Sequence, residues 1–144
     1  MEEVETGILM FAKTLRQNLE GFDGENSEVV GYAPEFFDFY VQLLDDERFP
    51  QMGRLLVNAA IAYFVSPTDV IPEEEVGPAG YIDDVYLCAY VANRLRSTID
   101  DEILAAAWPS DEDFHEVVDF LIDQTREKLD RSTRDEVTRY VGVQ

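Results

Sequence analysis

The chain has 144 residues, 46% of them apolar and 12% aromatic, with 31 acidic and 11 basic side chains. This length and apolar content predict one folded domain, residues 1–144, and argue against disorder. The formal net charge of −20 repels nucleic acid, so we expect no nucleic-acid partner.

Apolar residues recur with helical spacing over the first half of the chain. The pattern predicts a first helix over residues 3–19 and a loop over residues 22–33. A second helix is expected to begin at Pro34, because proline suits a first helical turn. The third helix should run over residues 50–65 and end before Pro67.

The second half is also helical in pattern. Residues 81–106 are apolar over most of the circumference, which predicts one long central helix. A fifth helix follows Pro109 with Ser110 or Asp111 as its cap, and a short sixth element follows Ser132. We therefore expect an all-α, single-domain bundle of five to six helices, with a rigid Pro/Asp-rich loop between helices three and four.

That loop concentrates residues that fix backbone shape. Prolines, a glycine and aspartates stand close together between two apolar helices, so the connection should adopt one shape. The candidate functional-loop residues are Ser66, Pro67, Asp69, Pro72, Gly80, Asp83 and Asp84.

The same segment, within residues 45–95, resembles the YkvA-like family. The resemblance is carried by Pro50, Leu55-Leu56, Ala62-Tyr63, Ser66-Pro67, Asp69, Ile71-Pro72, Gly80 and Asp83-Asp84. Glu73 departs from it, because the family usually has aspartate after the second proline. The resemblance implies a helical fold and supplies no agreed activity or catalytic residues.

The two adjacent aspartates fall on different faces of the expected fourth helix. Asp83 shares the polar side with Tyr90 and Arg94, whereas Asp84 lies on an apolar line with Cys88. A partly buried Asp84 needs hydrogen-bond donors, which the loop backbone or the Tyr63 hydroxyl could supply. Asp84 would then hold the loop in place as a latch.

An alternative uses the carboxylates as metal ligands. Six acidic side chains and no basic one lie between Arg54 and Arg94. Oxygen ligands of this kind suit Mg²⁺, Mn²⁺ or Ca²⁺ and could support phosphate-ester hydrolysis. The residues of this metal hypothesis are Asp69, Glu73, Asp83 and Asp84.

Other chemistry-bearing residues are few. The lone histidine, His115, is interpreted as a surface or half-buried packing residue. The lone cysteine, Cys88, is interpreted as an inert core thiol, and we find no zinc set, catalytic triad or phosphate-binding glycine loop. Trp108, just before a proline, is expected to pack the turn that follows the fourth helix.

The cellular setting follows from composition. A single cysteine rules out an internal disulfide, and the acidic start is unlike a basic secretory signal, so we expect a cytoplasmic protein. The longest nearly apolar run, residues 55–65, is too short for a transmembrane segment. Only two lysines accompany nine arginines, and an acidic, lysine-poor surface favours adaptation to concentrated salt. A basic protein partner is the other interpretation of the charge.

The sequence therefore favours an uncharacterised, non-catalytic interaction or scaffold module with an unknown protein partner and no cofactor. The alternative is a protein that binds a divalent cation, in one form a metal-dependent hydrolase. A homodimer is compatible with either function.

Overall fold

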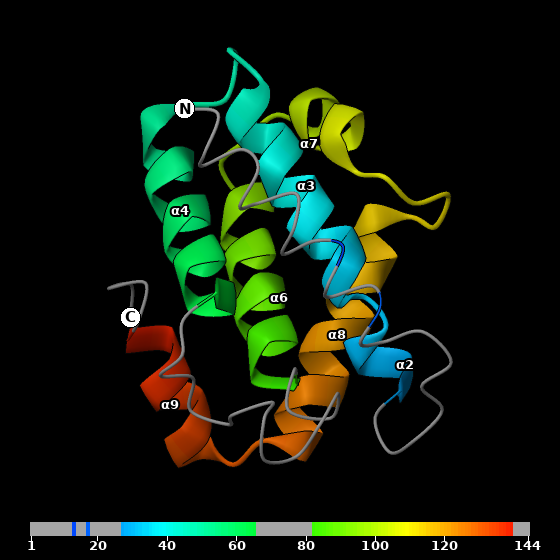
Figure 1. Cartoon of the computed structure of the whole chain (residues 1–144), viewed down its shortest axis with the longest axis vertical. Coiled ribbons are helices and arrows are strands. Elements are labelled where there is room, and N and C mark those ends of the chain that lie inside the picture. The colour runs from blue at the N-terminus through cyan, green and yellow to red at the C-terminus, as the bar shows by residue number, and fades with distance from the viewer. Residues whose placement is uncertain (1–12, 14–16, 18–26, 66–81, 140–144) are drawn as a thin grey trace.

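The computed structural model describes residues 27–65 and 82–139, together with Lys13 and Gln17. Over these residues the chain is built from helices and contains no strand, which confirms the all-α prediction (Figure 1). The helices are α2 (Ser27–Val30), α3 (Ala33–Asp45), α4 (Gln51–Val65), α6 (Ile82–Arg96), α7 (Asp101–Ala107), α8 (Phe114–Lys128) and α9 (Arg131–Arg139).

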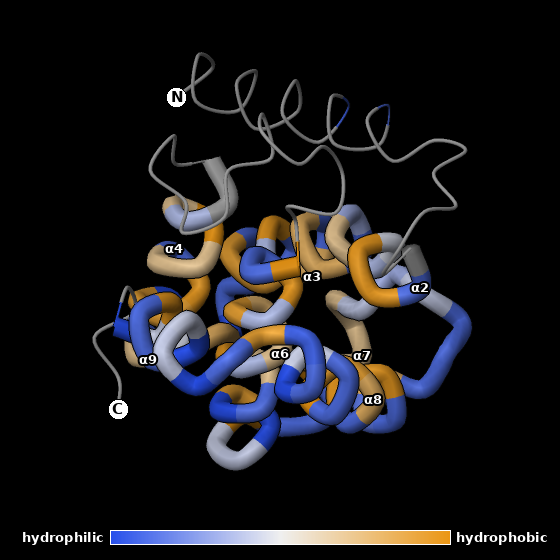
Figure 2. The backbone as a smooth tube through the Cα atoms, turned by 90° about the horizontal axis from the view of Figure 1, so that it is seen from below, coloured by the Kyte–Doolittle hydropathy of each residue, from blue (hydrophilic) through white to orange (hydrophobic). Residues whose placement is uncertain are grey.

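Helix α6 is the centre of the bundle. It contacts α2, α3, α4, α8 and α9, and both views show it between α4 and α8 (Figures 1 and 2). Eight consecutive residues, Ile82 to Ala89, are buried, so almost no part of its first two turns faces solvent. The prediction that this segment is central is confirmed.

Aromatic side chains join α3 to the chain that follows α6. Trp108 packs edge-on against Phe36 and Phe39 of α3, with ring centroids 5.2 and 5.4 Å apart. It also contacts Phe114, and its indole N–H donates to the carbonyl of Glu112 at 2.9 Å. Each buried phenylalanine stabilises the fold by roughly 1.5–3 kcal/mol relative to exposure. Trp108 therefore packs the turn after α7, as the sequence predicts.

The joint between α3 and α4 is held by Arg54. Its guanidinium donates to the carbonyls of Leu44 at 2.7 Å, Asp46 at 2.7 Å and Phe49 at 3.1 Å. These carbonyls lie at or just beyond the end of α3, where helical acceptors lack partners. The ring of Phe49 lies so close to α4 that a Cβ on Gly53 would come within 2.6 Å of it. Glycine at position 53 permits this close approach.

Several predicted boundaries are wrong. The loop expected over residues 22–33 contains the short helix α2. The helix expected over residues 81–106 is two helices, because the chain turns after Arg96, where the Ser97 hydroxyl donates to the carbonyl of Arg94 at 2.7 Å. Asp100 then precedes the new helix α7.

The predicted caps of the last two helices also need correction. Helix α8 is capped by Asp113, whose carboxylate accepts from the His115 N–H, and not by Ser110 or Asp111. Asp130 accepts from the Thr133 N–H at 2.8 Å and performs this role at the start of α9 in place of Ser132. In both cases an aspartate immediately before the helix reaches a free N–H of the first turn.

The first helix and the Pro/Asp-rich loop lie outside the described residues, apart from Lys13 and Gln17, which are helical. Within the described chain, no helix combines the length and the apolar character that a membrane crossing needs.

Candidate functional site

Two of the predicted loop residues can be placed. Asp83 and Asp84 lie in the first turn of α6. The other candidate loop and metal residues lie outside the described residues, and their roles stay predictions. They are Ser66, Pro67, Asp69, Pro72, Glu73 and Gly80.

Asp83 is buried against α4. Its side chain is 0% exposed, and its Oδ2 accepts a hydrogen bond from the Tyr63 hydroxyl at 2.5 Å. Tyr63 is itself 0% exposed, so this bond joins α4 to α6 within the core. The sequence placed Asp83 on a polar, outward side, which is wrong, because α4 covers that side of α6. The apolar spacing within one helix cannot show which of its faces another helix, distant in the sequence, will cover.

Asp84 is buried on the neighbouring line of the same helix. It is 1% exposed, which confirms and exceeds the partial burial expected from the sequence. Its negative charge lies in the first helical turn, where the helix dipole favours it. Burial, followed by the charge of Asp84, raises the pKa of the Cys88 thiol well above its usual value. Asp84 therefore shapes the electrostatics of the interior of α6.

The geometry bears on both hypotheses for the aspartates. A hydrogen bond from a buried tyrosine is what a structural role requires, because a buried carboxylate is costly without donors. No group of three or more histidine, cysteine or acidic side chains in the described ranges is arranged to hold a metal ion. Asp69 and Glu73, two of the four proposed ligands, lie beyond those ranges, so the metal hypothesis stays a prediction.

The two residues most suited to chemistry have structural surroundings. Cys88 is 1% exposed, and the Tyr40 hydroxyl donates to its carbonyl oxygen. A buried thiol with a raised pKa remains protonated at neutral pH and is a poor nucleophile. His115 is half-buried, stacks edge-on with Phe114, and places Nε2 3.1 Å from a carboxylate oxygen of Asp101. Both residues are placed as the sequence predicts.

The sequence interpretation missed a basic cavity of about 570 Å³. We call it the arginine cavity, because four of its lining residues are arginines. Asp135 and Thr138 also line it. Its other lining residues are Tyr86, Tyr90, Arg126, Arg131, Arg134 and Arg139. A signal was available, because residues 126–139 hold five of the chain's eleven basic side chains, namely Arg126, Lys128, Arg131, Arg134 and Arg139.

The proteins that this chain resembles have no assigned function. Residues 54–90 match the family model described as a protein of unknown function, DUF1232. The chain is also 34% identical over 88 residues to an uncharacterized protein, ORF9, of Methanothermobacter thermautotrophicus. That alignment covers 61% of this chain and 58% of the relative. No solved structure matches. The family match includes α4 from Arg54 onward and the first two turns of α6, so it contains Tyr63, Asp83 and Asp84.

Proposed function

We propose that this protein is a non-catalytic interaction module that docks through the exposed face of α4, and that the first occupant of this face is a second copy of the chain. The observation that carries the proposal is an apolar, uncharged surface on a protein of net charge −20. Among the large apolar side chains of the described chain, Met52 and Leu55 are the most exposed, at 75% and 59%.

The α4 face extends beyond these two side chains. Gln51, Asn58 and Ala62 are also exposed and lie with Leu55 along one side of the helix at spacings of three and four residues. None of the five carries a charge, and α4 contains no acidic residue along its whole length. Each large apolar side chain that leaves water on docking contributes roughly 1.5–3 kcal/mol.

Charge selects the occupant. Two copies of this chain repel each other over most approaches, because acidic side chains outnumber basic ones by 31 to 11. Contact between two α4 faces brings no carboxylate of α4 against another, so α4 itself adds no repulsion between carboxylates there. Five exposed side chains are few beside the roughly 20–30 residues that each partner contributes to a stable complex, so we expect weak, reversible association that salt strengthens by screening.

Sedimentation velocity tests the proposal. We expect the wild-type chain to shift from monomer toward dimer as protein concentration and KCl rise. The variant Met52→Lys/Leu55→Lys should stay monomeric, although its two added positive charges reduce overall repulsion. Ala105→Lys/Ala106→Lys is the matched control, because it adds the same charge at exposed positions of α7. A monomeric wild type at all salt concentrations, or an α4 variant that dimerises like the wild type, would overturn the proposal.

The non-catalytic part of the proposal is supported by the buried thiol of Cys88 and by the use of Asp83 in a hydrogen bond within the core. Both groups are buried within the bundle, which supports a non-catalytic role.

A further inference from the structure

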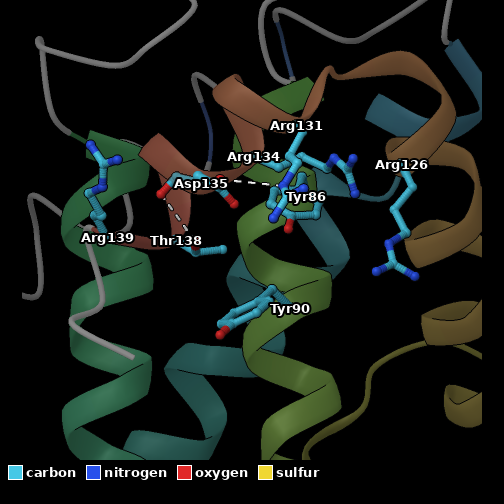
Figure 3. A pocket seen from close by; sticks show the side chains of 8 residues that line it. All are labelled: Tyr86, Tyr90, Arg126, Arg131, Arg134, Asp135, Thr138 and Arg139. Atoms are coloured by element: carbon cyan, nitrogen blue, oxygen red, sulfur yellow. Dashed lines mark hydrogen bonds and ion pairs between the residues drawn. The ribbon is translucent and has the colours of Figure 1, made fainter. Parts of the chain in front are cut away.

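We propose that the arginine cavity is a binding site for a small phosphorylated organic molecule. Four guanidinium groups and two phenol rings line a cavity of about 570 Å³, within the range of small-molecule sites. Figure 3 shows that they come from three helices, with the tyrosines on α6, Arg126 on α8 and the remaining arginines on α9. The site exists only in the folded bundle.

The charge of the cavity is opposite to that of the protein. Its lining includes one acidic residue, Asp135, beside four arginines, a formal charge of +3 (4 − 1) in a chain of net −20. Other hollows of the described surface are acidic: one is lined by Glu28 and Glu35, and another by Glu112, Asp113 and Glu116. The arginine cavity is therefore a local reversal of the field that excludes anions elsewhere.

The arginines are incompletely neutralised by their surroundings. The ion pair between Arg131 and Asp135 is 3.9 Å long, and both side chains are largely exposed, so it is weak. The Nε atom of Arg134 is buried and has no hydrogen-bond partner in the described part of the chain. A buried N–H without an acceptor is costly, and a ligand oxygen would satisfy it.

The arrangement selects phosphate among anions. Arginine presents a planar fork of N–H donors that matches the oxygens of phosphate in a bidentate manner. Figure 3 draws Arg131 and Arg134 of α9 beside Tyr86, with Arg126 of α8 farther to one side, and the charges of both Arg134 and Arg126 act on the Tyr86 hydroxyl. An oxyanion held there could accept donors from two helices at once.

The tyrosines select an organic group attached to the phosphate. The rings of Tyr86 and Tyr90 lie 6.4 Å apart, one helical turn along α6, and form a wall of the cavity. Burial raises the pKa of Tyr86, although Arg134 and Arg126 act in the opposite direction, so its hydroxyl keeps its proton at neutral pH. An aromatic wall beside an arginine group suits a ligand with a flat apolar part. The volume leaves room for such a part beside one phosphate.

Isothermal titration of phenyl phosphate into the full chain tests the assignment, with inorganic phosphate titrated separately. We expect saturable binding near one equivalent, tighter for phenyl phosphate than for inorganic phosphate and weakened by KCl. Arg134→Gln should weaken binding about tenfold or more, because a charge-assisted bond is lost. Arg48→Gln is the matched control: it makes the same charge change at an exposed position in the connection between α3 and α4, and should bind like the wild type.

Three outcomes would overturn the proposal. Wild-type protein that binds neither compound saturably shows that the cavity is not a phosphate site. Equal binding by Arg134→Gln and wild type places any binding elsewhere. Arginine-dependent binding to vesicles of phosphatidic acid, without binding of phenyl phosphate, would identify a lipid headgroup as the ligand in place of a soluble ester. None of these results depends on whether the chain dimerises through α4.

Discussion

Helix α6 takes part in two regions of opposite charge. Its first turn holds two buried aspartates, and its next two turns line the arginine cavity together with α8 and α9. At the first turn, Asp83 and Asp84 are 0% and 1% exposed, and one of them already accepts a hydrogen bond from Tyr63. From the next turn onward, Tyr86 and Tyr90 face guanidinium groups across a cavity. The acidic groups are enclosed by the protein, whereas the basic groups line a space that a ligand can enter.

The comparison shows that a charged residue can be conspicuous in the sequence without being accessible to a ligand. The paired aspartates belong to the matched family segment and are the most conspicuous charges of the chain. Both are buried, and one of them, Asp83, is hydrogen-bonded to Tyr63 of α4. The arginines lie outside the matched segment, yet they have the volume and the partly unsatisfied donors that binding requires.

The largest expected effect is at the first turn of α6. Asp84→Ala should lower the free energy of unfolding by about 1–3 kcal/mol, because buried donors lose their acceptor. Asp45→Ala, at an exposed position near the end of α3, should change it by no more than about 0.5 kcal/mol. Urea denaturation followed by circular dichroism measures both. An Asp84→Ala variant as stable as the wild type would remove the structural role assigned to this carboxylate.

A smaller effect is expected at the arginine cavity. The double variant Arg126→Gln/Arg134→Gln should change the free energy of unfolding by no more than about 0.5 kcal/mol, because Arg126 is exposed and the Nε of Arg134 makes no described hydrogen bond. The same denaturation experiment measures it. A loss as large as that of Asp84→Ala would mean that the arginines hold the fold together, and the contrast between the two regions would fail.

The smallest effect is expected from divalent cations. In chelator-treated protein at high KCl, Mg²⁺, Mn²⁺ and Ca²⁺ should raise the melting temperature no more than KCl of matched ionic strength, since screening alone stabilises so acidic a chain. Isothermal titration with wild type and Asp84→Asn provides the second measurement. Saturable binding near one equivalent that Asp84→Asn abolishes would favour the metal hypothesis. That hypothesis also predicts that Asp84→Ala stabilises the metal-free protein, opposite in sign to the structural role.

The parts of the fold that were predictable depend on local signals. Pro34 marks the start of α3, the prolines and apolar spacing delimit α4, and the apolar circumference of residues 82–96 identifies the central helix. The break between α6 and α7 was missed because Leu95, Ile99 and Ile103 continue a helical spacing of apolar residues across Ser97 and Thr98. Their hydroxyls satisfy carbonyls at the end of α6 and so allow the chain to turn.

The candidate sites were less predictable, because they depend on contacts between distant segments. The sequence offered the Tyr63 hydroxyl as a donor to Asp84, whereas the described bond reaches the adjacent Asp83, twenty residues along the chain. The arginine cavity joins α6 to α8 and α9, and its lining runs from Tyr86 to Arg139, 53 residues along the chain. The concentration of arginines after residue 125 was visible in the sequence, but the tyrosines opposite them become evident only in the folded bundle.

The Arg54 contacts have a consequence for how the protein responds to acid and alkali. Both sides of this joint, a guanidinium and backbone carbonyls, keep the same charge over the whole pH range in which proteins are handled. The Arg54 contacts should therefore be among the last in the bundle to yield when pH is the denaturant.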